Sequence, residues 1–191
     1  MTPKTSRGLI LLSLHAAVII GAALAATGQK PADNPHKSVS ARDSVLYSRE
    51  ASKLLPVTLF FRGEETVVES RNSGGIQFPD GMYLLAAVIE TSGHAAGLHE
   101  VLEACFFTEV PLNMNGHALQ PGVYEIGVDD RHHFTMMDIA ARPMFVAESE
   151  SDLRLLRPKP LQMLSDSLTH DYRLYVGREY VTLSRVHQQT K

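Results

Sequence analysis

Apolar residues are unevenly distributed along this chain of 191 residues. An apolar run without charged residues, Leu9–Ala26, is followed by a stretch that is almost wholly polar. From Pro56 onward, short apolar runs alternate with Gly, Pro, Asn and Asp, a punctuation that is typical of all-β domains. We therefore predict a mostly β domain over residues 56–184, built as an antiparallel sandwich or barrel, and a polar tail over residues 185–191.

The first apolar run has the features of a secretory signal peptide. Lys4 and Arg7 precede it, and it ends in Ala23-Leu24-Ala25, the small-x-small pattern at which such peptides are cleaved. Residues 1–25 are therefore predicted to be removed, and the mature chain is expected in the periplasm or outside the cell. The alternative is a retained membrane anchor, although a run of about 18 residues lies at the short edge for a spanning helix. Only this alternative predicts contact with a membrane.

Residues 26–55 are interpreted as a leader that precedes the domain. Up to about residue 42 the leader has almost no apolar side chains, so burial cannot offset the entropy cost of ordering it. This part is expected to be flexible. Loosely periodic apolar residues, among them Val45, Ala51 and Leu54, predict a short helix over Ser44–Leu55.

Turn signals divide the domain into short strands. Strands are predicted over residues 56–61, 66–71, 82–91, 99–110, 123–128, 134–139, 144–147, 172–176 and 179–184. Asn115-Gly116 predicts a hairpin, because a type I′ turn needs two residues with positive φ. Residues 72–75 and 92–97 are expected as loops, and Ser149–Leu156 as a single helical turn. The prolines of Arg157–Pro160 cannot donate a hydrogen bond, which places this segment at an edge or an end of a sheet.

Two of the predicted strands differ in their pattern of apolar residues. Residues 82–91 are apolar on both faces, which predicts a central strand. In residues 123–128, Val123 and Glu125 point one way while Tyr124 and Ile126 point the other, which predicts a half-buried strand.

Composition excludes some classes of function. The chain has 18 Lys and Arg against 21 Asp and Glu, a net charge of −3, and loss of Lys4 and Arg7 with the signal peptide leaves it more acidic. Nucleic-acid binding is therefore not expected, since it needs clustered basic residues. Cys105 is the only cysteine, so no intrachain disulfide forms. Its apolar surroundings in the sequence predict a buried, unreactive side chain.

Several short segments resemble a family of small exported bacterial proteins of unknown function. These segments are Arg71-Asn72-Ser73-Gly74-Gly75, Phe78-x-Asp80-Gly81, Glu90-Thr91-Ser92-Gly93, Glu109-Val110-Pro111-Leu112, Leu119-x-Pro121-Gly122-x-Tyr124, Arg157-Pro158-Lys159-Pro160-Leu161 and Tyr172-Arg173-Leu174-Tyr175-x-Gly177-Arg178-x-Tyr180-Val181. The resemblance covers roughly residues 56–184 and implies an exported β-rich domain. It implies no activity.

The histidines are candidate metal ligands. His132 and His133 lie beside Asp129-Asp130, and imidazole with carboxylate suits zinc or copper. Adjacent residues on a strand point to opposite faces, however, so this pair alone is a poor chelator. His94 and His99 come from a separate predicted loop. A metal site therefore requires the fold to bring the two groups together, and no cofactor is otherwise predicted.

The tyrosines are candidate ligand-binding residues, while no residue is assigned a catalytic role. Tyr124, Tyr175 and Tyr180 lie on predicted strands, where exposed tyrosines would form a recognition surface for protein or sugar. The alternative is that they cover the core with their hydroxyl groups in water. The Gly-x-Ser-x-Gly elbow of serine hydrolases is absent from the sequence, and the paired carboxylates lie in predicted turns.

These patterns predict a non-enzymatic exported β domain that binds an envelope protein or a small ligand. The alternative is a metal-dependent envelope enzyme that uses His94, His99 and either His132 or His133. Clustering of these histidines in the fold would favour the enzyme, and wide separation would favour the binding domain.

Overall fold

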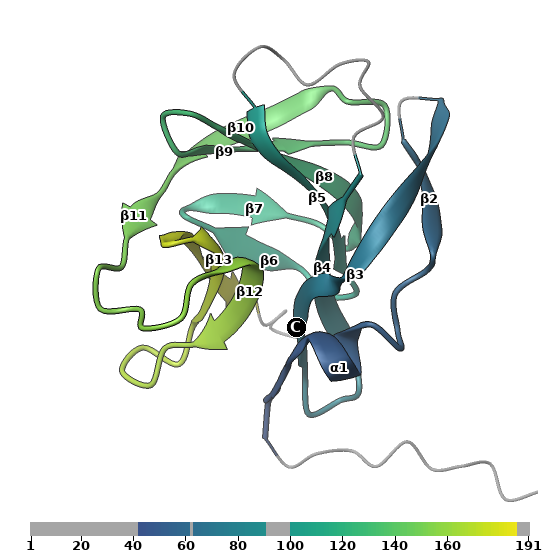
Figure 1. The fold of residues 1–191 in the computed structure, drawn as a ribbon. Coiled ribbons are helices and arrows are strands. Elements are labelled where there is room, and N and C mark those ends of the chain that lie inside the picture. Colours follow the sequence, from purple (N-terminus) through teal and green to yellow (C-terminus); the bar gives the residue numbers. More distant parts are fainter. Residues whose placement is uncertain (1–41, 62, 91–99, 187–191) are drawn as a thin grey trace, which may run out of the picture. The chain divides into compact units, whose positions relative to one another are not determined.

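The computed structural model describes residues 42–61, 63–90 and 100–186, and these residues form a β-sandwich of two antiparallel sheets (Figure 1). Its elements are β1 (Ser44–Leu46), α1 (Ser48–Ala51), β2 (Thr58–Phe61), β3 (Glu64–Gln77), β4 (Tyr83–Ile89), β5 (Glu100–Thr108), β6 (Leu112–Met114), β7 (His117–Leu119), β8 (Gly122–Asp129), β9 (His133–Met137), β10 (Pro143–Glu148), β11 (Glu150–Ser151), β12 (Lys159–Ser165), β13 (Tyr172–Gly177) and β14 (Glu179–Arg185). The predicted fold class is confirmed. Within these residues, no helix is long and apolar enough to cross a membrane.

The two sheets differ in size and in strand order. The larger has the order β1-β3-β4-β5-β8-β9-β10, with β2 paired to β3. The smaller has the order β12-β13-β14-β6-β7, with β11 paired to β14. The central place predicted for residues 82–91 is confirmed, because β4 lies between β3 and β5. The proline-rich segment enters β12, an edge strand of the smaller sheet, also as predicted.

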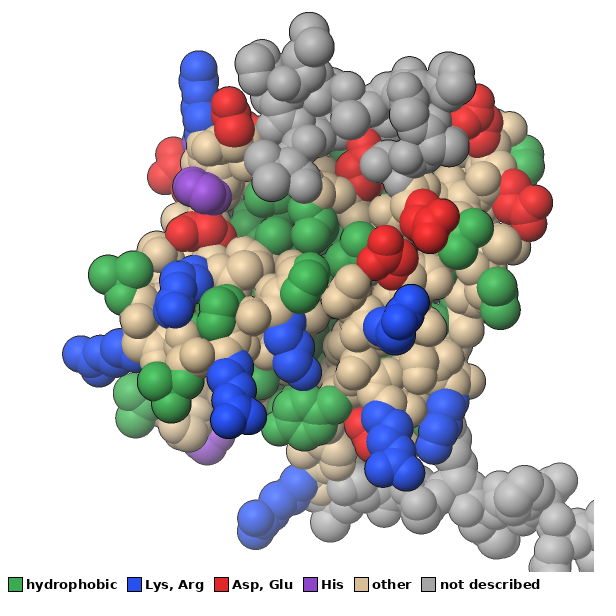
Figure 2. Space-filling model, viewed as in Figure 1, with side chains coloured by type: hydrophobic (Ala, Val, Ile, Leu, Met, Phe, Trp, Pro, Cys, Tyr) green, Lys and Arg blue, Asp and Glu red, His purple; other side chains and the backbone are tan. Residues whose placement is uncertain are grey.

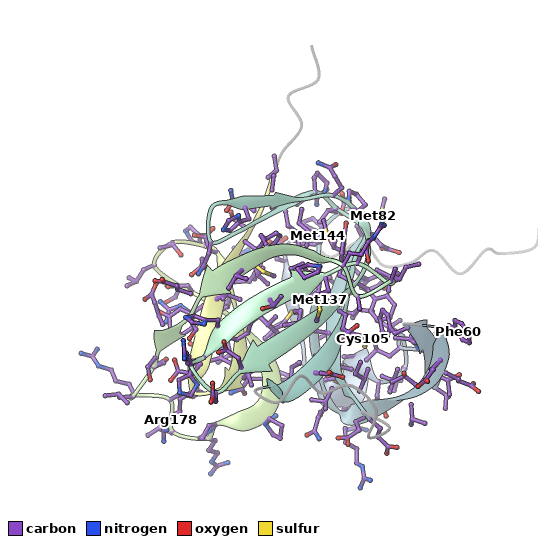
Figure 3. The ribbon with its side chains drawn as sticks, turned by 90° about the horizontal axis from the view of Figure 1, so that it is seen from above. Phe60, Met82, Cys105, Met137, Met144 and Arg178 are labelled. Carbon is purple, nitrogen blue, oxygen red and sulfur yellow. The ribbon has the colours of Figure 1, made fainter. Side chains whose placement is uncertain are left out.

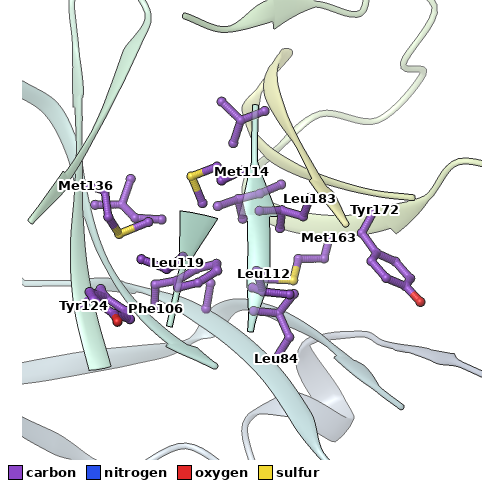
Figure 4. Packing of buried hydrophobic residues seen from close by; sticks show 14 of the residues in the cluster. Leu84, Phe106, Leu112, Met114, Leu119, Tyr124, Met136, Met163, Tyr172 and Leu183 are labelled. Carbon is purple, nitrogen blue, oxygen red and sulfur yellow. The ribbon is translucent and has the colours of Figure 1, made fainter. Parts of the chain in front are cut away.

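The main hydrophobic core lies between the two sheets. Leu84 and Phe106 enter it from β4 and β5 of the larger sheet, and Met114, Met163 and Leu183 enter it from the smaller sheet (Figure 4). All five side chains are at most 1% exposed. The alternation of strand residues places these side chains inward, and it leaves the residues between them on the outer faces of the two sheets.

A second hydrophobic cluster covers the outer face of β3, β4 and β5. Ala51 of α1 and Phe61 of β2 pack there against Leu85 and Cys105 of the larger sheet. This layer explains why β4 is apolar on both faces. The thiol of Cys105 is fully buried and donates to the carbonyl of Ala87 at 3.3 Å, and burial raises the pKa of this thiol to about 12. The prediction that Cys105 (Figure 3) is buried is confirmed. A thiol with a raised pKa stays protonated at neutral pH and is a poor nucleophile.

Two segments predicted to be helical contain strand residues in the structure. Of residues 44–55, only Ser48–Ala51 are helical, because Ser44–Leu46 pair with β3 and extend the larger sheet. Glu150 and Ser151, expected to start a helical turn, pair instead with Tyr180 and Glu179 of β14. In both places pairing with a distant strand overrides a local preference that was weak in a short segment.

The loop predicted for residues 72–75 is wrong, because β3 continues through it. The strand accommodates these residues with a β-bulge, where the register against β4 shifts between Glu69 and Ser73. The Asn72 side chain donates to Glu69 Oε2 at 2.8 Å, and Ser73 Oγ donates to the carbonyl of Ser70 at 2.5 Å. The glycines that follow serve sheet packing rather than a turn.

Of two other local predictions, the hairpin is confirmed and the half-buried strand is not. Asn115 and Gly116 have φ values of 45° and 90°, as a type I′ hairpin requires, and they join β6 to β7. The half-buried strand predicted for residues 123–128 is wrong, since Glu125 on its outer face is only 1% exposed. Residues 92–97 lie outside the described residues.

Candidate functional site

Two of the four candidate metal ligands, His132 and His133, lie at the turn between β8 and β9. His133 Nδ1 lies 2.9 Å from Asp129 Oδ2, and the His133 backbone N donates to Asp129 Oδ1 at 2.8 Å. Burial raises the pKa of Asp129, but the hydrogen bonds from His133 and Arg131 outweigh this and lower it overall. His132 is exposed and takes a left-handed φ of 67° at the turn. The pair therefore offers a metal ion no convergent imidazoles.

The other two candidate metal ligands, His94 and His99, lie outside the described residues. Over residues 42–61, 63–90 and 100–186, no group of three or more His, Cys, Asp or Glu side chains is arranged to hold a metal ion. A metal site that includes His94 or His99 stays a prediction.

The three candidate tyrosines fall into two places. Tyr124 belongs to the core between the sheets, where its hydroxyl donates to the carbonyl of Gln120 at 2.8 Å and its ring packs over Gly122. Burial raises the pKa of this phenol. Tyr175 and Tyr180 instead lie opposite each other on β13 and β14, outside that core, with ring centroids 5.1 Å apart. Only Tyr175 and Tyr180 form a cluster.

Arg173 completes this cluster on the outer face of the smaller sheet. Its guanidinium carbon lies 4.4 Å from the ring centroid of Tyr180, a cation–π contact, and its Nη2 donates to Asp166 Oδ2. Tyr180 donates its hydroxyl proton to Glu150 at 2.7 Å. These interactions occupy the polar atoms of the cluster with partners from the protein itself.

The phenols of this cluster are held in the protonated form. Burial, followed by the hydrogen bond to Glu150, raises the pKa of Tyr180 to about 12 from its ordinary 10.0. Burial also raises the pKa of Tyr175. A phenol with a raised pKa donates hydrogen bonds at neutral pH and is a poor general base. The cluster is therefore suited to holding structure in place and not to proton abstraction.

We expect one tyrosine of the folded protein to titrate near pH 12. Because its folded pKa lies above 10, the Tyr180 contribution to stability is constant below pH 10 and is lost as the pH rises toward 12. Glu150→Gln removes the carboxylate and should lower this pKa, with tyrosinate absorbance as the measurement. Glu148→Gln is the control, because the Glu148 side chain is exposed on the preceding strand, β10. It should leave the titration of Tyr180 unchanged. A titration of Tyr180 at its ordinary pKa would contradict the buried cluster.

The cluster fixes the segment between β11 and β12. Asp152 Oδ2 accepts from the Tyr175 hydroxyl at 3.1 Å. Arg178 Nη1 donates to the carbonyls of Asp152, Leu153 and Leu155, at 3.4, 3.3 and 2.6 Å. In return, the Asp152 backbone N donates to the carbonyl of Arg178 at 2.9 Å. The segment is thus held in one conformation by the sheet beneath it.

An apolar groove of about 450 Å³ opens on the outer face of the larger sheet. Its floor is a row of paired residues, Leu85, Phe107 and Val123, contributed by β4, β5 and β8. Leu54 and Leu55, which follow α1, form one wall. Val123 and Leu54 are 38% and 45% exposed, so apolar surface in the groove faces solvent. Volume and lining match those of small-molecule sites.

Polar groups also line this groove. The Glu109 carboxylate lines it and accepts from the backbone N of Tyr83 at 2.8 Å through Oε2. The Tyr83 hydroxyl is held at 3.1 Å from the side-chain nitrogen of Gln77. The groove thus combines an apolar floor with a fixed negative charge at its rim.

A second hollow, of about 520 Å³, is less suited to a ligand because several of its charged groups already have partners in the protein. Arg185 donates to Asp80 at 2.6 Å and stacks over Phe78, with its guanidinium carbon 4.8 Å from the ring centroid. The Tyr172 hydroxyl donates to Asp43. A polar ligand would have to replace these internal bonds, whereas the apolar groove needs only to lose water.

Sequence reasoning did not find the groove, because its residues come from separate segments of the chain. One signal was available. Phe107 and Val123 are apolar, and each points to the opposite strand face from its neighbour, Phe106 or Tyr124. Apolar side chains on this outer face also need to be shielded from water. The sequence could not show that α1 leaves this part of the face open.

No protein-family model, curated protein or solved structure matches the chain. The resemblance to small exported bacterial proteins therefore stays a prediction, and function has to be argued from the groove and the surfaces described above.

Proposed function

We propose that this chain is an exported, non-enzymatic β domain that binds a small amphipathic ligand in the cell envelope. The groove over Leu85, Phe107 and Val123 supports this best, because it leaves apolar side chains, among them Val123 and Leu54, open to solvent beside a fixed carboxylate. An apolar body would displace water from the row, and a head group that donates hydrogen bonds would face Glu109. The apolar run Leu9–Ala26 supports export, with cleavage after Ala25.

The charge of the groove sets the expected chemistry of the ligand. Glu109 is the only charged residue among the described residues that line the groove. A carboxylate attracts a cationic amine and repels a carboxylate head. We therefore expect the ligand to be an amine, or a neutral molecule with hydroxyl or amide donors, rather than a fatty acid.

Binding in the groove predicts a defined pattern of competition. The protein purified from the envelope fraction should enhance the fluorescence of the neutral apolar probe N-phenyl-1-naphthylamine. Octylamine should displace this probe at lower concentration than octanoate, and Glu109→Gln should abolish the difference between the two. Val123→Gln places an amide on the apolar floor and should weaken binding of the probe about tenfold or more.

Val146→Gln is the matched control, since Val146 is a strand residue of β10, 52% exposed and outside the groove. The proposal fails if Val123→Gln binds the probe as the unmodified protein does, or if octanoate competes better than octylamine. The intact mass of the same preparation tests export separately, because cleavage after Ala25 leaves a chain that begins at Ala26.

A further inference from the structure

The segment between β11 and β12 exposes large apolar side chains among cations. Leu153 and Leu156 are 82% and 92% exposed. Arg154, Arg157 and Lys159 alternate with them along the chain, and all three are exposed. Figure 2 shows basic and hydrophobic side chains interspersed over the lower left of the view, where Figure 1 places this segment.

The leucines are exposed although the backbone beneath them is fixed. Arg178 donates hydrogen bonds to the backbone carbonyls of Asp152, Leu153 and Leu155 in this segment. Asp152 Oδ1 accepts from the backbone N of Arg154 at 3.0 Å in a tight turn. Pro158 and Pro160 restrict the chain that leads into β12. Both leucines therefore remain in water in a preorganised arrangement, which lowers the entropy cost of binding a surface.

The charges around these leucines indicate what the surface binds. Within the part of the chain that the structure describes, neither Arg154 nor Arg157 forms an ion pair, so both remain available to an external anion. Lys159 Nζ lies 6.0 Å from the ring centroid of Tyr47, which is 58% exposed. Leucines, basic residues and a half-exposed tyrosine together are the side chains that favour the interface of an anionic bilayer.

We propose that Leu153, Leu156, Arg154, Arg157, Lys159 and Tyr47 form a docking surface for an anionic lipid bilayer. The leucines enter the boundary between head groups and acyl chains, while the cations contact lipid phosphates. The sequence predicted membrane contact only through a retained N-terminal helix, whereas this surface belongs to the β domain.

Vesicle flotation tests this proposal with the full chain recovered from the envelope fraction. Vesicles of phosphatidylcholine are compared with vesicles that also contain phosphatidylglycerol. The unmodified protein should float with the anionic vesicles and dissociate as salt concentration rises. The double variant Leu153→Ser/Leu156→Ser should partition at least about tenfold less. Each of Arg154→Gln and Arg157→Gln should reduce partitioning roughly fivefold.

Leu168→Ser is the matched control, because Leu168 is 89% exposed in the turn between β12 and β13. It should float as the unmodified protein does. Every variant shares the same N-terminus, so differences between them report the docking surface and not the first apolar run. Equal binding to both vesicle types, or unchanged flotation of the double variant, would overturn the proposal. It also fails if the two leucines prove necessary for binding another protein but not for binding vesicles.

Discussion

Phe106→Ala is expected to lower the free energy of unfolding by about 3–5 kcal/mol, the range observed when a buried aromatic side chain is removed from a core. Phe106 is fully buried on β5, between β4 and β8, where it packs between the two sheets (Figure 4). The cavity cannot close easily, because the neighbouring side chains are fixed on both sheets. Urea denaturation with a two-state fit measures the change.

Phe60→Ala is the matched control for this experiment. Phe60 also lies on a strand of the larger sheet, but it is 68% exposed on β2 (Figure 3). Its removal should change the free energy of unfolding by no more than about 0.5 kcal/mol. If both variants lose the same stability, the core between the sheets is not the main source of stability in this domain.

The sequence predicted those features of the fold that depend on neighbours in the chain. Asn115-Gly116 requires two positive φ values wherever it occurs, so the hairpin of β6 and β7 was predictable. The apolar faces of residues 82–91 required burial on both sides, which only a central strand provides. Features that depend on distant pairing were not predictable. Nothing near Glu150 in the sequence indicates that it pairs with Tyr180 on β14.

The same distinction applies to the candidate sites. The tyrosines on β13 and β14 were predictable as a cluster, because the hairpin at Gly177-Arg178 places Tyr175 opposite Tyr180. Their partners were not predictable, since Asp152 and Glu150 come from a different part of the chain. A recognition surface required exposed tyrosines, but Tyr175 and Tyr180 are only 2% and 7% exposed. Their role in the structure is to hold the segment that exposes the leucines.

The groove and the docking surface also differ in how they relate to the pattern of apolar residues. Leu153 and Leu156 lie outside the regular strands, just before Arg157–Pro160, whose prolines predicted an edge position. An apolar residue at an edge has no covering layer by default, and two such residues close together among cations form the surface that we propose for a bilayer. Val123 lies within a strand, where the same apolar character usually means burial. Only the three-dimensional arrangement shows that it stays open.

The wrong prediction for residues 72–75 has a physical reason. Gly-Gly after Asn-Ser is a turn signal, because glycine permits left-handed φ. Among the described glycines, positive φ occurs at Gly63, Gly81, Gly116 and Gly177, and not at Gly74. At Gly74 the absence of a side chain instead allows β3 to lie close to β12. A Cβ built there lies 2.9 Å from the backbone N of Met163.

Gly74→Ala should therefore destabilise the protein by about 1–3 kcal/mol, and Gly74→Val by more. The atom in the way belongs to the backbone of β12, so no side-chain rotation relieves the overlap, and the two sheets must move apart locally. The movement would also disturb the packing of Met163, which is 1% exposed. Thermal and urea unfolding of both variants measure the loss, and the larger side chain should give the lower midpoint.

Gly63→Asn separates this overlap from the general cost of replacing a glycine. Gly63 has a φ of 85°, and a Cβ there meets nothing within 4 Å. Asparagine tolerates this conformation better than other side chains, so the variant should lose no more than about 1 kcal/mol. Equal stability of Gly74→Val and the unmodified protein would show that the sheets are not in close contact at this point. The arrangement of β12 against β3, which also positions the segment with the exposed leucines, would then have to be revised.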